Sequence, residues 1–144
     1  MTALGLVLCT HILAAVFGTG QVGVLALVMV PALRTNDAAR ASLLPVLRRF
    51  LLWMNLSLAI LVLTGGILDY QMGSTLHTMW WFRISFLLTL VIGALSGRMR
   101  GMLRRAVGPS GQVSAQAMTG LTMPAWTMFG LTVAIVVLMV LRPW

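Results

Sequence analysis

The 144-residue sequence contains no lysine and no glutamate, and its only acidic residues are Asp37 and Asp69. It has one cysteine, Cys9. A single cysteine excludes an internal disulfide, and two isolated aspartates exclude a carboxylate pair for general acid–base catalysis. Neither aspartate lies in the first apolar segment, which excludes an exporter that carries protons on an acid there. We interpret Cys9 as a small buried side chain rather than as a nucleophile.

Apolar residues, in contrast, make up 60% of the sequence, and the mean hydropathy is +1.00. A soluble domain of this size has more surface than so few polar groups could cover. The apolar residues form four runs, at about residues 3–30, 50–68, 79–97 and 123–141. Each is long enough to cross a bilayer as a helix, and none shows the short alternating pattern of a membrane strand. The sequence therefore predicts an all-α fold, one membrane domain over residues 1–144 in which four transmembrane helices form an antiparallel bundle.

The distribution of arginine predicts the orientation of this bundle. Two stretches, after the first and third runs, hold eight of the ten arginines: Arg34, Arg40, Arg48, Arg49, Arg98, Arg100, Arg104 and Arg105. The stretch between the second and third runs has none, and the C-terminal tail has only Arg142. The positive-inside rule places both arginine-rich stretches in the cytoplasm and both termini outside it. We expect the protein to lie in the lipid bilayer of a bacterial inner membrane. We attribute its net charge of +8 to contacts with anionic head groups rather than with nucleic acid.

An ionisable residue at membrane depth is costly and is therefore a candidate for function. His11 lies eight residues into the first run, about 12 Å along a helix axis. Ala14, Ala15 and Gly18 follow on the same helical face. Such small residues let a neighbouring helix or a flat ligand approach closely. His11 is thus either a cofactor ligand or a histidine that is hydrogen-bonded across the bundle.

Three further candidates lie at the start of the third run. Arg83 is expected in the same leaflet as His11, where it either reaches outward to the head groups or faces the bundle and binds a carboxylate such as a propionate. His77 lies at the outer boundary and could share a ligand with His11. Trp80, one turn further on, is typical of an interface anchor.

Three short motifs occur in order along the chain. The first is His11-Ile-Leu-Ala-Ala-Val, with Gly18-x-Gly20 and the exit Val30-Pro31-Ala32-Leu33-Arg34. The second is Arg48-Arg49-Phe50 leading to Leu63-Thr64-Gly65, and the third is Trp80-Trp81-Phe82-Arg83. Together they resemble the first three helices of the copper-resistance D domain and its relatives, whose third helix opens with Trp-x-x-Lys. That superfamily includes the HemJ-type protoporphyrinogen oxidases.

The resemblance implies a four-helix membrane fold and a histidine, at the position of His11, that serves b-type haem in the HemJ-type members. It also implies importance for the basic residue at the position of Arg83. Two parts of the HemJ-type pattern differ here. Phe17-Gly18-Thr19-Gly20 stands in place of their Trp-x-Gly-Gly, and Ser96-Gly97 stands near the place of their Tyr-His. The resemblance therefore leaves oxidase activity undecided.

Three hypotheses follow. The first is a haem-b-binding bundle in membrane electron transfer or tetrapyrrole redox chemistry. In it His11 is an axial iron ligand, Arg83 pairs with a propionate, and His77 or a methionine is the second ligand, with Gly18 and Trp80 also at the cofactor. The second is a cofactor-free accessory subunit that packs against other membrane subunits or copies of itself. The third is copper transport or resistance, which would use His77 and the soft thioethers of Met72 and Met79.

Overall fold

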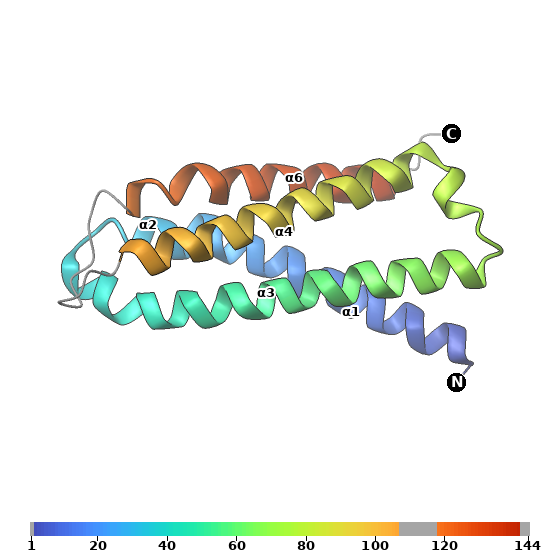
Figure 1. Ribbon diagram of the computed structural model, residues 1–144, viewed down its shortest axis with the longest axis horizontal. Coiled ribbons are helices and arrows are strands. Elements are labelled where there is room, and N and C mark those ends of the chain that lie inside the picture. Colours follow the sequence, from blue (N-terminus) through green and yellow to red (C-terminus); the bar gives the residue numbers. More distant parts are fainter. Residues whose placement is uncertain (1, 107–117, 142–144) are drawn as a thin grey trace.

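The computed structural model describes residues 2–106 and 118–141, and these are almost entirely helical (Figure 1). Helix α1 (Ala3–Val24) continues through the π-helix η1 (Leu25–Met29) into α2 (Val30–Ala32). Helices α3 (Asp37–Gln71), α4 (Trp80–Ala106) and α6 (Thr122–Leu141) follow, with the short 3-10 helix η2 (Leu76–Thr78) between α3 and α4. Within the described residues, four helical segments are long and apolar enough to cross a membrane. The predicted all-α, four-helix membrane fold is confirmed.

The helices extend beyond the apolar runs that predicted them. Helix α3 is capped by Asn36, whose Oδ1 accepts a hydrogen bond from the Ala39 N–H at 2.7 Å. Its 35 residues give a length of about 52 Å, against about 30 Å for the hydrocarbon core of a bilayer. A helix satisfies its own backbone groups, so it can continue through the head-group layer where the apolar run ends. Most arginines of the two basic stretches therefore lie on helices rather than in loops, whereas Arg142 lies outside the described residues.

Pro31 does not end the first helical segment, which continues to Ala32. In a regular α-helix a proline clashes with the carbonyl four residues before it and provides no N–H. The backbone widens into the π-helix η1 just before this point, and the Val30 N–H bonds to the Leu25 carbonyl. Such a π turn inside an α-helix is a known way to change the local register. The segment therefore passes through Pro31 without a break.

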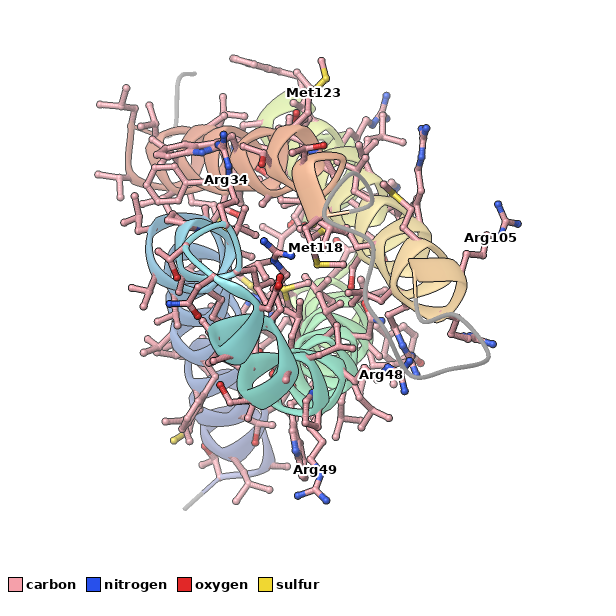
Figure 2. All side chains as sticks on the ribbon, turned by 90° about the vertical axis from the view of Figure 1, so that its left-hand side faces the viewer. Arg34, Arg48, Arg49, Arg105, Met118 and Met123 are labelled. Atoms are coloured by element: carbon pink, nitrogen blue, oxygen red, sulfur yellow. The ribbon has the colours of Figure 1, made fainter. Side chains whose placement is uncertain are left out.

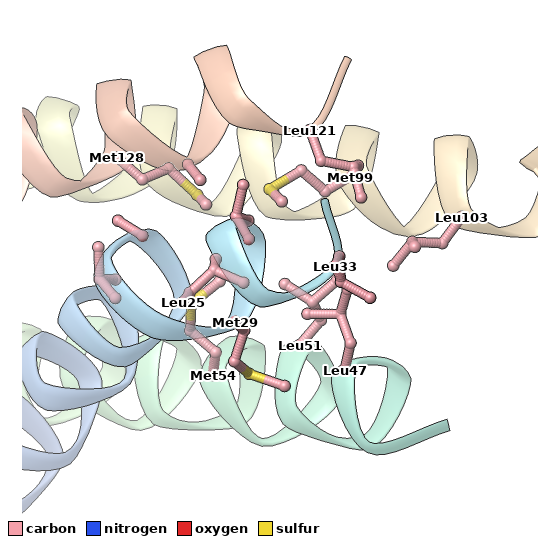
Figure 3. Packing of buried hydrophobic residues seen from close by; sticks show 14 of the residues in the cluster. Leu25, Met29, Leu33, Leu47, Leu51, Met54, Met99, Leu103, Leu121 and Met128 are labelled. Carbon is pink, nitrogen blue, oxygen red and sulfur yellow. The ribbon is translucent and has the colours of Figure 1, made fainter. Parts of the chain in front are cut away.

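The most closely packed part of the bundle lies toward its arginine-rich end (Figure 3). Helix α1 packs mainly on α3, and α4 packs mainly on α6. Between these pairs lies a core of leucine and methionine side chains: Leu25, Met29, Leu33, Leu47, Leu51, Met54, Met99, Leu103, Leu121 and Met128. Inside a membrane such contacts act through close van der Waals packing, because lipid tails are as apolar as the side chains.

The opposite end of the bundle is built differently. The first turns of α1 run away from α4 and α6 in Figure 1, and their leucines are largely exposed. Cys9 lies on this part of α1 and is exposed, so the expectation of a buried cysteine was wrong. The buried side chains of this end include hydroxyl groups on α3 and α4, namely Thr64, Ser85 and Thr89. The candidate site lies among them.

Candidate functional site

His11 forms a hydrogen bond between α1 and α3. Its Nδ1 lies 2.8 Å from Oγ1 of Thr64. The two helices are antiparallel, with His11 eight residues from the start of α1 and Thr64 seven residues from the end of α3. Both side chains therefore lie at a similar depth, about 10–12 Å along their helices. The imidazole is half-buried and the threonine is buried.

The hydrogen bonds of Thr64 favour one of the two neutral tautomers of His11. A hydroxyl group has one proton to donate. The Thr64 hydroxyl donates it to the carbonyl of Ile60 at 2.7 Å, with a longer contact of 3.2 Å to the carbonyl of Leu61. In this arrangement its oxygen is the acceptor for an N–H on Nδ1 of His11, 2.8 Å away. With the proton on Nδ1, the lone pair of the neutral ring lies on Nε2, and the backbone carbonyl of Leu61 is a further hydrogen-bond partner of the ring.

His11 lines a cleft that consists of two adjoining cavities, of about 30 Å³ and about 190 Å³. Four residues line both cavities: His11, Gly65, Phe82 and Met139. The smaller cavity is also lined by Leu61, Val62, Ser85, Phe86 and Thr89, and the larger by Leu68, Leu76 and Trp81. The cleft is thus bordered by α1, α3, α4 and α6, and it extends toward the turn between α3 and α4.

The cleft contains polar groups that its apolar walls do not satisfy. Ser85 is only 2% exposed, and its Oγ has no hydrogen-bond partner among the described residues. Thr89, one turn further along α4, donates its hydroxyl proton to the Ser85 carbonyl at 2.8 Å. A Cβ on Gly65 would lie 3.5 Å from Cε1 of His11, so this glycine faces the edge of the ring. The imidazole and an unpaired hydroxyl therefore border one small space.

His77 and Arg83 take part in a separate network in the turn between α3 and α4. Asp69 accepts two hydrogen bonds from His77, one from the backbone N–H to Oδ1 and one from ring Nδ1 to Oδ2, each 3.1 Å long. Nε of Arg83 donates to the carbonyl of His77 at 2.5 Å. Neither His77 nor Arg83 is among the described residues that line the cleft. The structure therefore does not bring these two residues together with His11.

The other predicted site residues are also placed away from the cleft. Trp80 is 46% exposed, and its neighbour Trp81 lines the larger cavity instead. Gly18 is buried where a Cβ would lie 3.9 Å from Cβ of Ser57, so it serves the packing of α1 on α3. Met72 and Met79 are both exposed. Within the part of the chain that the structure describes, no three His, Cys, Asp or Glu side chains come together as a metal site.

The cleft holds two side chains of types that can ligate haem iron, an imidazole and a thioether. A neutral imidazole with a free Nε2, held through Nδ1–H by a second residue, is the usual form of a metal-ligating histidine. The thioether of Met139 borders the same two cavities, and a histidine–methionine pair is an established haem ligand set. The cavities are smaller than the 300–1,000 Å³ typical of organic ligand sites. The two described cavities are therefore too small to enclose a whole porphyrin.

The fold and the cleft define the class of protein, a four-helix integral membrane bundle with one histidine at membrane depth. Residues 5–143 match the model of the family described as "Predicted integral membrane protein (DUF2269)", and the chain belongs to that family. This match supports a membrane protein family and carries no assignment to the copper-resistance D or HemJ-type superfamily. No match was found among curated proteins or among solved structures.

Proposed function

We propose that this protein binds haem b in the His11 cleft and takes part in membrane electron transfer. The observation that carries the proposal is the 2.8 Å contact between Nδ1 of His11 and Oγ1 of Thr64. This contact holds the ring in one orientation, and with the proton on Nδ1 it leaves Nε2 free to ligate a metal. A bound haem would supply one-electron redox chemistry.

The other residues of the cleft have defined parts in this proposal. Met139 would be a second residue to hold the haem, in place of His77, which is engaged by Asp69. Gly65 lies against the edge of the imidazole, where a Cβ would meet Cε1 of His11 at 3.5 Å. Aromatic side chains of Trp81 and Phe82 provide apolar walls. Arg83 donates to a backbone carbonyl in the turn, so a propionate contact would require this side chain to move.

The proposal includes a position in the cell. By the positive-inside rule the arginine-rich end faces the cytoplasm of a bacterium. The cleft then lies in the outer leaflet of the inner membrane, with both termini outside the cytoplasm. Fusion of a reporter enzyme to the C-terminus tests this topology. Activity of alkaline phosphatase, which requires an oxidising compartment, supports the assignment, and its absence together with an active cytoplasmic reporter contradicts it.

The visible spectrum of the detergent-purified protein, oxidised and then reduced with dithionite, tests the haem proposal. We expect a Soret band and, on reduction, an α-band that His11→Ala abolishes. The matched control is His77→Ala, which removes the other histidine and should keep the spectrum. Added imidazole should restore the bands of His11→Gly, because it supplies the missing nitrogen ligand. Circular dichroism of each variant establishes that loss of colour is not loss of fold.

Two adjacent glycines test the location of the haem. A side chain at Gly65 points toward His11, whereas a Cβ on Gly66 meets no heavy atom within 4 Å. Gly65→Leu should fill the cleft and prevent haem binding, and Gly66→Leu should bind haem as the unmodified protein does. A folded protein that shows no absorption bands, even after incubation with haem, contradicts the proposal. The accessory-subunit hypothesis would then be tested by identifying copurifying membrane proteins.

A further inference from the structure

A second depression lies at the arginine-rich end of the bundle and is independent of the His11 cleft. It has a volume of about 220 Å³, and its described lining consists of Arg48, Arg100 and Arg104. Arg100 and Arg104 are four residues apart on α4, so their side chains share one helical face. Arg48 lies across from them on α3. Two helices thus bring three guanidinium groups to one concave site.

The chain supplies no carboxylate to this site. Its two acidic residues are both engaged elsewhere: Asp37 pairs with Arg40 at 2.5 Å, and Asp69 pairs with His77. None of the three lining arginines forms an ion pair or side-chain hydrogen bond within the described parts of the chain. Three like charges around one depression repel each other, and an anion that they share would relieve that repulsion.

The position of the depression along the helices indicates the kind of anion. Arg48 comes two residues before Phe50, where an apolar run starts, and Arg100 comes three residues after Gly97, where another ends. The site is therefore at the level of the lipid head groups. Guanidinium groups bind phosphate oxygens through paired N–H bonds. Basic pockets between membrane helices are also suited to anionic lipids.

We propose that Arg48, Arg100 and Arg104 form a binding site for a phosphate group at this end of the bundle. The phosphate belongs either to an anionic phospholipid or to a free phosphate anion. Both present the same negatively charged oxygens to the three arginines, and the experiment below separates the two sources.

Each lining arginine has a near neighbour that does not line the depression. These neighbours are Arg49, Arg98 and Arg105. Arg49 and Arg105 point away from the bundle in Figure 2, which views the arginine-rich end. A triple variant of the lining set (R48Q, R100Q and R104Q) and one of the neighbouring set (R49Q, R98Q and R105Q) therefore remove the same charge from the same helices. Only the first removes the site.

The experiment measures thermal unfolding of the full-length protein in neutral detergent. Phosphatidylglycerol is titrated in one arm and inorganic phosphate in the other, with phosphatidylcholine as the lipid without net charge. In the lipid arm we expect the apparent affinity of the lining triple to be roughly a hundredfold weaker than that of the unmodified protein, about fivefold for each arginine. The neighbouring triple should bind within a few-fold of the unmodified protein.

The two arms separate the outcomes. If phosphatidylglycerol alone raises the unfolding temperature, the site binds a lipid. If inorganic phosphate raises it equally, and only the lining triple loses this effect, the site binds a free anion. Both results support a phosphate site. Equal losses in the two triples would show diffuse charge attraction and overturn it, as would no shift in either arm. If the lining triple does not fold, the single variants Arg100→Gln and Arg98→Gln repeat the comparison.

Discussion

The half of the bundle nearest the arginines and the half that contains His11 bury different kinds of side chain. In the first half, leucine and methionine from all four segments fill the space between the helices (Figure 3). In the second half, the buried hydroxyls of Ser85 and Thr89 line a cleft, and that of Thr64 contacts His11 beside it. The core of the first half is close-packed and includes the buried hydroxyl of Ser96, whereas the second half combines polar groups with open volume.

This difference indicates where the chain can accept a ligand. Close packing of the leucine and methionine core leaves no space for a second molecule among those side chains, and it contributes to stability through many small van der Waals contacts. A buried polar group without a partner costs free energy and is rarely kept without a reason. His11 and Ser85 border the same cavity, so we infer that the leucine and methionine core supports the fold and that the His11 cleft binds a ligand.

The largest expected effect distinguishes packed from lipid-facing leucines within the arginine-rich half. Leu51 is fully buried, whereas the adjacent Leu52 is 48% exposed. We expect Leu51→Ala to lower the free energy of unfolding by about 2–5 kcal/mol, because it leaves a cavity. Leu52→Ala should lower it by less than about 1 kcal/mol, since lipid replaces the lost contacts. Reversible unfolding in mixed micelles measures both, and equal losses would refute the assignment of the packed core.

The second prediction concerns the hydrogen bond between α1 and α3 in the polar half. Thr64→Val removes the hydrogen bond between His11 and the Thr64 hydroxyl, which should cost about 1–3 kcal/mol. Thr132 is the matched control because it is equally buried, at 8%, and its hydroxyl bonds only to the Met128 carbonyl of its own helix. Thr132→Val should change the stability by less than about 0.5 kcal/mol. The prediction fails if both variants unfold at the same midpoint.

The smallest expected effect separates the turn network from the cleft. Asp69→Ala removes both hydrogen bonds to His77, and at this partly exposed position it should cost about 1 kcal/mol or less. Asp37→Ala at the other end should have a smaller effect, because that carboxylate is 92% exposed. Haem titration of both variants should match the unmodified protein. A weaker affinity in Asp69→Ala would show that the turn network contributes to the cleft.

The number and approximate position of the helices could be predicted because the length of an apolar run reflects the thickness of the bilayer. The residues at which the helices begin and end could not be predicted in this way. Arg48 and Arg100 are as compatible with a helix in the head-group layer as with a loop, since charge does not interrupt backbone hydrogen bonds. The first apolar run was predicted to stop at residue 30, just before Pro31, but the π-helix before the proline allows the segment to continue to Ala32.

His11 could be identified from the sequence because a histidine at membrane depth is uncommon. Its partners could not, since Thr64, Ser85 and Met139 are residue types found throughout membrane helices. They become neighbours only through the rotation of each helix about its axis. The same rotation turns Arg83 outward and leaves Trp81 rather than Trp80 at the cleft. The depth of a residue in the membrane can be predicted from its position along the chain. The side of the helix that faces the bundle cannot be predicted where the apolar run is continuous.

The central claim is that the neutral His11 ring carries its proton on Nδ1 and presents a free Nε2 to the cleft. Nitrogen-15 NMR of protein labelled only at histidine tests it most directly, because the chain has two histidines and His77→Ala assigns the remaining signals. The account predicts a protonated Nδ1 and an unprotonated Nε2 for His11 at neutral pH, with this preference lost in Thr64→Val. A proton on Nε2 in the unmodified protein would contradict the account, because that nitrogen could not then ligate iron.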